Sequence, residues 1–143
     1  MDKPPSEDDW RSEPWCLDAK AAYERFNGAT LDEAFRMISE DALNREEDLM
    51  FMPAICFRYY LPAYLSYLTS DAARGDSDGA SCVFGLIDHR LDDLSVDPVL
   101  LRNTAETIAY VGERQEWFDA DTEIYGSFER KASRLLRKLN TER

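Results

Sequence analysis

The sequence of 143 residues is poor in the side chains that carry most enzymatic chemistry. It holds one histidine, His89, and three cysteines, Cys16, Cys56 and Cys82, with no Cys-x-x-Cys pair. Structural zinc sites and dithiol redox motifs need such pairs, and a hydrolytic triad would have to recruit His89, which no nucleophile elbow accompanies. An odd, scattered set of cysteines in apolar surroundings indicates reduced core thiols in a cytoplasmic protein.

Long apolar runs and glycine-rich phosphate loops are also missing. No stretch of about 18 apolar residues is present, and the first residues lack the basic and apolar regions of a signal peptide. We therefore expect a cytoplasmic protein with no membrane partner. Gly75 and Gly79 are not followed by Gly-Lys-Ser or Gly-Lys-Thr, and the acids around them do not have EF-hand spacing, so no nucleotide or calcium loop is expected.

Alternation with period two is absent as well, whereas apolar residues recur at steps of three and four. This pattern predicts an all-α fold, a single compact domain of five to six helices. The predicted helices cover residues 14–26, 31–43, 53–73, 80–91, 97–118 and 121–140. Residues 1–12 are expected to form a flexible acidic arm ahead of the helical domain, residues 13–143.

Two of these helices have clear local signals. Thr30 and Glu33 form a capping box ahead of an apolar stripe. The segment 53–73 is rich in tyrosine and leucine around its whole circumference, which predicts a buried central helix. Pro62 lies inside it, and an internal proline removes a backbone hydrogen bond, so we expect a kink near residues 58–61 or two helices meeting there.

Charge is the most prominent property of the chain, which has a net charge of −12. Residues 1–126 hold 27 Asp/Glu against 11 Lys/Arg, a net of −16, and residues 127–143 hold six Lys/Arg against two Glu, a net of +4. An acidic body repels nucleic acid and attracts basic proteins. The expected partner is therefore a basic protein, with no direct binding of nucleic acid, and acidity that serves solubility alone remains the alternative.

The candidate binding residues are clustered acids, which we expect to be exposed. One group lies near the loop at 74–79 and the helix after it: Asp76, Asp78, Asp88, Asp92 and Asp93. A second group is Glu46, Glu47 and Asp48. No cofactor or metal is expected, although His89 could share a helix face with Asp92 and Asp93 to hold a metal or act in an enzyme.

The block Leu49-Met50-Phe51-Met52-Pro53, followed by Phe57-Arg58-Tyr59-Tyr60-Leu61-Pro62-Ala63-Tyr64-Leu65, resembles a family of small uncharacterised bacterial cytosolic domains. The resemblance covers about residues 28–139 and implies a helical domain with no established activity. In size, charge and lack of catalytic motifs the chain also resembles the immunity proteins of bacterial toxin systems, which bind a cognate toxin and block its active site.

These observations lead to one expected function and three alternatives. The expected function is that of a non-enzymatic immunity or antitoxin-type protein, a monomer or small homo-oligomer, whose acidic surface covers the basic catalytic cleft of a toxin. The alternatives are a DNA-mimic inhibitor, a helical adaptor domain without catalysis, and an enzyme that uses His89.

Overall fold

The computed structural model describes residues 3–141 and confirms the all-α class: this part of the chain contains ten α-helices, one short 3-10 helix and no strand. The elements are α1 (Glu7–Trp10), α2 (Leu17–Phe26), α3 (Leu31–Glu40), α4 (Ala42–Phe51), α5 (Ala54–Leu68), η1 (Asp71–Ala73), α6 (Ser77–His89), α7 (Leu91–Leu94), α8 (Pro98–Gly112), α9 (Thr122–Tyr125) and α10 (Phe128–Thr141). The prediction of five to six helices was too low, because α1 and α7 are additional single turns of four residues and two predicted helices, 31–43 and 121–140, are each divided.

The additional boundaries have local causes. Asp41 leaves the helical conformation (φ −161°, ψ 74°) and its side chain accepts a hydrogen bond from the Asn44 amide, so it ends α3 and caps α4. Gly126, with φ 76°, separates α9 from α10 within the predicted helix 121–140. The helix expected at 97–118 ends at Gly112.

Helix α5 is the centre of the molecule and packs against α1, α3, α4, α7 and α8. Ten of its 15 residues are buried. The buried Tyr60 hydroxyl donates to the carbonyls of Phe26 and Ala29, and Tyr64 donates to the carbonyl of Gly79, so these polar groups are satisfied inside the core. Helix α5 continues through Pro62, so the alternative of two helices that meet at this proline is wrong.

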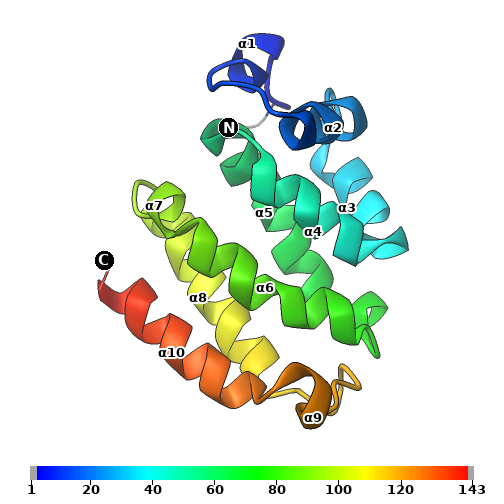
Figure 1. Ribbon diagram of the computed structural model, residues 1–143, viewed down its shortest axis with the longest axis vertical. Coiled ribbons are helices and arrows are strands. Elements are labelled where there is room, and N and C mark those ends of the chain that lie inside the picture. Colours follow the sequence, from blue (N-terminus) through cyan, green and yellow to red (C-terminus); the bar gives the residue numbers. More distant parts are fainter. Residues whose placement is uncertain (1–2, 142–143) are drawn as a thin grey trace.

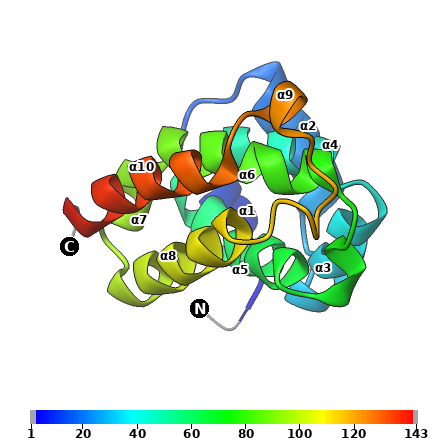
Figure 2. The same ribbon diagram turned by 90° about the horizontal axis from the view of Figure 1, so that it is seen from below.

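Helix α8 runs antiparallel to α6 and α10, which run in the same direction as each other, and α2 to α5 make up the other half of the molecule (Figure 1). Helix α10 packs on both α8 and α6. Helix α9 and the loop before it lie at the opposite end of the long axis from α1 and α2 (Figure 1). Seen from below, that loop crosses near the beginning of α6 (Figure 2).

The segment expected to be a flexible arm contains helix α1, which begins with a capping box formed by Ser6 and Asp9. Trp10, its last residue, is fully buried and its ring lies 5.6 Å from that of Tyr23 and 6.2 Å from that of Tyr60. Trp10 therefore fastens this end of the segment to α2 and α5. Within residues 3–141, no helix combines the length and the apolar character needed to cross a membrane.

Candidate functional site

The acidic group on α4 is mostly buried. Asp48 is 3% exposed and accepts hydrogen bonds from Arg25 at 2.6 and 2.7 Å, and its carboxylate lies 2.8 Å from Arg45 Nε. Glu46 is 9% exposed, and burial, with a smaller effect from Glu47, raises its pKa to about 7. The expectation of an exposed patch therefore fits only Glu47, because α4 turns the neighbouring carboxylates towards α2 and the core.

The acids of α6 fall at its two ends. Asp76 caps the helix by accepting from the Gly79 amide and also accepts from the Tyr67 hydroxyl, and the exposed Asp78 accepts from the Tyr125 hydroxyl at 2.6 Å. Asp88 lies twelve residues after Asp76, a distance of about 18 Å at the helical rise. Its carboxylate pairs with Lys138 at 2.6 Å.

Beyond the C-terminus of α6, Asp93 pairs with Arg90, and Asp92 is exposed. The structure thus brings Asp76 and Asp78 together and separates them from Asp88, Asp92 and Asp93. Two of the second set already have cationic partners within the chain, so their charges are partly neutralised.

Asp76 and Asp78 join a larger acidic surface, here called the acidic end, which consists of residues 71–78 and 113–129. These two segments contain nine Asp/Glu and two Arg, a net charge of −7 in a chain of net −12. They are joined by the Tyr125–Asp78 hydrogen bond and by a bond of 3.1 Å from the Gly75 amide to the Trp117 carbonyl. The two views agree in placing α9 and its preceding loop beside the beginning of α6 (Figures 1 and 2).

Apolar groups are exposed within the acidic end. Ile124 is 74% exposed, and Trp117 is half-buried with its ring edge-on to the buried Phe118 at 4.9 Å. Asp121 holds this loop by capping α9, with its side chain accepting from the Glu123 amide at 2.8 Å. A large apolar side chain surrounded by carboxylates is the composition expected of an anchor in a protein interface.

A cavity of about 790 Å³ opens beside Trp117, between the C-terminal end of α8 and α10. Ala109, Gly112 and Leu136 form apolar parts of its wall. The charged residues that line it are Glu113, Glu116, Glu129 and Arg114. The acids near this site are not adjacent in the sequence but one or two residues apart, so they do not stand out as a cluster, although a window of net charge over residues 113–123 would have revealed them.

The groups considered for catalysis do not converge. His89 is exposed at the last position of α6. Across residues 3–141, no three His, Cys, Asp or Glu side chains are grouped as metal ligands would be. Burial raises the pKa of both Cys56 and Cys82 to about 12, so these thiols are protonated at neutral pH and poorly nucleophilic.

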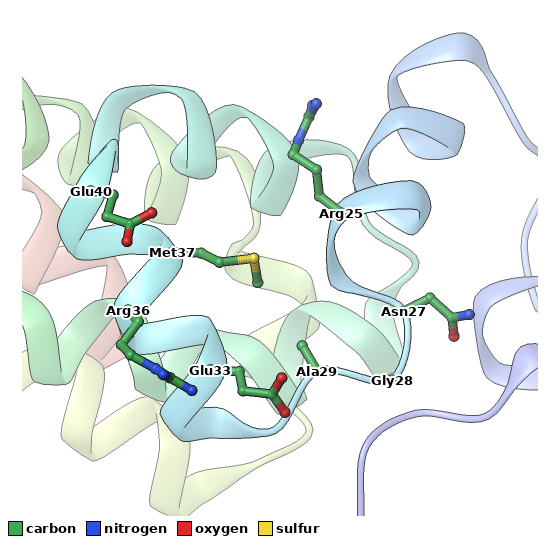
Figure 3. Close-up of a pocket in the computed structure, with 8 residues that line it drawn as sticks. All are labelled: Arg25, Asn27, Gly28, Ala29, Glu33, Arg36, Met37 and Glu40. Atoms are coloured by element: carbon green, nitrogen blue, oxygen red, sulfur yellow. The ribbon is translucent and has the colours of Figure 1, made fainter.

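Two further hollows are occupied by side chains that already have structural roles. In the hollow of about 340 Å³ between α2 and α3, Arg25 and Asn27 point in different directions, and neither points toward Glu33 (Figure 3). Arg25 is bound to Asp48 and Glu33 belongs to the capping box.

The second is the groove between α6 and α10, which is lined by the cations Lys131, Arg134 and Lys138. Lys131 donates to the Tyr125 carbonyl and Lys138 pairs with Asp88. These two cations therefore already have partners within the chain, whereas the acidic end holds nine Asp/Glu against two Arg. Comparison of the chain with models of protein families, with curated proteins and with solved structures found no match.

Proposed function

We propose that this protein is an immunity or antitoxin-type protein that binds a basic partner through its acidic end and covers the partner's catalytic cleft. The observation that carries the proposal is the net charge of −7 concentrated in residues 71–78 and 113–129, with Trp117 and Ile124 accessible within it. Complementary charge speeds association with a basic surface, and apolar anchors supply affinity once contact is made.

The compensation of charge elsewhere favours the acidic end over the other acidic groups. Asp48, Asp88 and Asp93 are bound by arginine or lysine of the same chain. An ion pair within the chain reduces the field that a basic partner would meet. Glu116 and Glu123, by contrast, are exposed and take part in no ion pair among residues 3–141, so their charge is open to a partner.

Affinity capture followed by mass spectrometry tests the proposal. The tagged protein is used as bait in its source cells, beside the charge-reversed variant Glu116→Lys/Glu123→Lys. The matched control, Asp18→Lys/Glu24→Lys, changes the same number of charges on α2, at the other end of the long axis (Figure 1). We expect wild type and control to capture one stoichiometric basic protein with a toxin-type catalytic domain, and the first variant to lose it.

Kinetics and inhibition complete the test. With the purified partner, the association rate of the acidic-end variant should fall about tenfold or more in 50 mM NaCl, and the difference should shrink in 300 mM NaCl. Wild-type protein should also inhibit the partner's catalytic activity at equimolar concentration. Capture of a nucleic-acid-binding protein would support a DNA mimic instead, and a partner that keeps its activity when bound would support an adaptor.

A further inference from the structure

We infer that the cavity beside Trp117 binds a guanidinium group, that of an arginine side chain of the basic partner. The inference rests on the proposed function, because it takes the partner to be a basic protein. It adds the chemical group that the acidic end recognises and the place where that group is held. Four properties of the cavity carry it: room, unpaired carboxylates, a helix C-terminus and an aromatic wall.

The first property is space beside apolar surface. The cavity measures about 790 Å³ and is open, so an extended side chain can enter it from solvent. Ala109, Ala132 and Leu136 provide apolar wall for the methylene groups of such a side chain. Long cationic side chains bury their methylene stems in this way and keep the charged group among polar partners.

The second property is uncompensated negative charge. Arg114 is the cation among the lining residues, and it is held by Tyr110: its guanidinium lies 3.7 Å from the ring centroid, and it donates to the Tyr110 carbonyl at 2.9 Å. It reaches Glu113 at 3.6 Å. Glu116 and Glu129 form no ion pair within residues 3–141, so two carboxylates at the cavity remain available to an incoming cation.

The third property is the position of the cavity at the end of α8. Ala109 and Gly112 belong to the last turn of that helix and line the cavity. The C-terminus of a helix carries partial negative charge on its unpaired carbonyl groups, and it attracts cations over the last turn. The end of α8 therefore adds to the negative potential that Glu116 and Glu129 create in the cavity.

The aromatic wall selects a guanidinium over a compact ammonium. Trp117 lines the cavity and is half-exposed. A planar guanidinium stacks on aromatic rings and donates in a fork to carboxylates, whereas an ammonium is a strongly hydrated point charge. The same chain already places the guanidinium of Arg11 4.1 Å from the ring centroid of Trp15, and that of Arg90 4.4 Å from the centroid of Phe57.

A small probe tests the cavity without the partner. The full chain, labelled with ¹⁵N, is titrated with N-acetyl-arginine amide, and the indole N–H signals are followed by NMR. We expect a saturable shift of the Trp117 signal in the millimolar range, with the signals of the buried Trp10 and of Trp15 as internal references. N-acetyl-citrulline amide has the same shape without the charge and should leave Trp117 unshifted.

Paired variants provide the control. Glu116→Gln/Glu129→Gln removes the two unpaired carboxylates and should weaken binding of the probe about tenfold or more. Glu24→Gln/Glu106→Gln removes two exposed carboxylates from α2 and α8 outside the cavity and should leave it unchanged. A response to citrulline equal to that to arginine, or full binding by the first variant, would overturn the inference.

The outcomes separate this inference from the proposed function. If a basic partner is captured but the arginine probe does not shift Trp117, the cavity is not the recognition site and the proposed function stands. If the probe binds but no basic protein is captured, the proposed function fails, and the assignment of the guanidinium to a partner fails with it.

Discussion

Helix α4 carries two buried carboxylates, Glu46 and Asp48, and only that of Asp48 is paired with cations. Asp48 receives both Arg25 and Arg45, so its charge is compensated. The side chain of Glu46 has no ion pair or hydrogen bond among residues 3–141, and burial raises its pKa from 4.5 to about 7. Between these two values the folded protein binds more protons than the unfolded chain does. The contribution of Glu46 to stability is therefore retained at low pH and lost as the pH rises towards 7.

We predict that Glu46→Gln stabilises the protein at pH 8 by about 2 kcal/mol and has little effect near pH 5, because the amide cannot ionise. Asp48→Asn makes the same chemical change two residues away and should destabilise the protein by about 2 kcal/mol, since it leaves two arginines without a negative charge to pair with and replaces one acceptor oxygen by an NH₂ donor. Urea unfolding of both variants at pH 5, 6, 7 and 8 measures these differences. Parallel stability curves for wild type and Glu46→Gln would contradict the prediction.

The orientation of these two residues could not be predicted from the sequence. The apolar stripe of residues 31–43 was assigned to one helix, which left Glu46, Glu47 and Asp48 beyond its end as an exposed patch. The break at Asp41 starts a new helix with its own axis, and this rotates Glu46 and Asp48 inward. A capping aspartate in the middle of a polar stretch has too little local signal to reveal that change.

At the level of helices, the packing of α8 against α10 depends on one glycine. A Cβ atom at Gly112 would lie 2.4 Å from the Cβ of Ala132 on α10, closer than such atoms ever approach. Gly85, in the exposed face of α6, has no atom within 4 Å of the corresponding position. Gly112 and Gly85 therefore provide a direct comparison of a closely packed helical glycine with an unobstructed one.

We predict that Gly112→Ala destabilises the protein by about 1–3 kcal/mol, because α8 and α10 must move apart. Gly85→Ala should stabilise it by about 0.5–1 kcal/mol, since alanine restricts the unfolded chain and nothing obstructs its methyl group. Thermal and urea unfolding of both variants measure the changes. A stabilised Gly112→Ala would show that the α8–α10 contact is loose.

The central helix and the capping signals were the most predictable elements. The tyrosine- and leucine-rich segment around Pro62 forms the buried helix α5, and the capping box at Thr30 and Glu33 begins α3 as expected. The wrong predictions concern turns in the chain. Gly126 divides the predicted last helix. Single helical turns such as α7 are too short to show apolar periodicity. Apolar periodicity indicates which faces are buried, but it locates helix ends poorly.

For the molecule as a whole, charge is separated between the acidic end and α10. The described part of α10 carries Arg130, Lys131, Arg134, Arg137 and Lys138, whereas the acidic end has a net charge of −7. The contrast between an acidic body and a basic C-terminal segment was evident in the sequence. That residues 71–78 and 113–129 form one surface was not evident, because residues 79–112 lie between them and only the tertiary packing joins them.

Like charges so concentrated repel one another in the folded state. We predict that Glu116→Gln/Glu123→Gln raises the midpoint of thermal unfolding by about 3 °C at 20 mM NaCl, and that 0.5 M NaCl removes most of this gain. Differential scanning calorimetry at both salt concentrations measures it. The same variant should bind the basic partner more weakly, which would show that the surface is kept for binding at a cost in stability. An unchanged midpoint at low salt would mean that these carboxylates do not repel each other appreciably.

The bonds from Tyr125 to Asp78 and from Gly75 to Trp117 fix the two loops of the acidic end to each other in the protein by itself. A surface already locked in shape loses little conformational entropy when a partner docks, so most of its contact energy remains as affinity. Such a surface also tolerates little rearrangement to fit other shapes. For the proposed basic partner, the two hydrogen bonds would present a rigid surface that accepts a narrow set of complementary shapes.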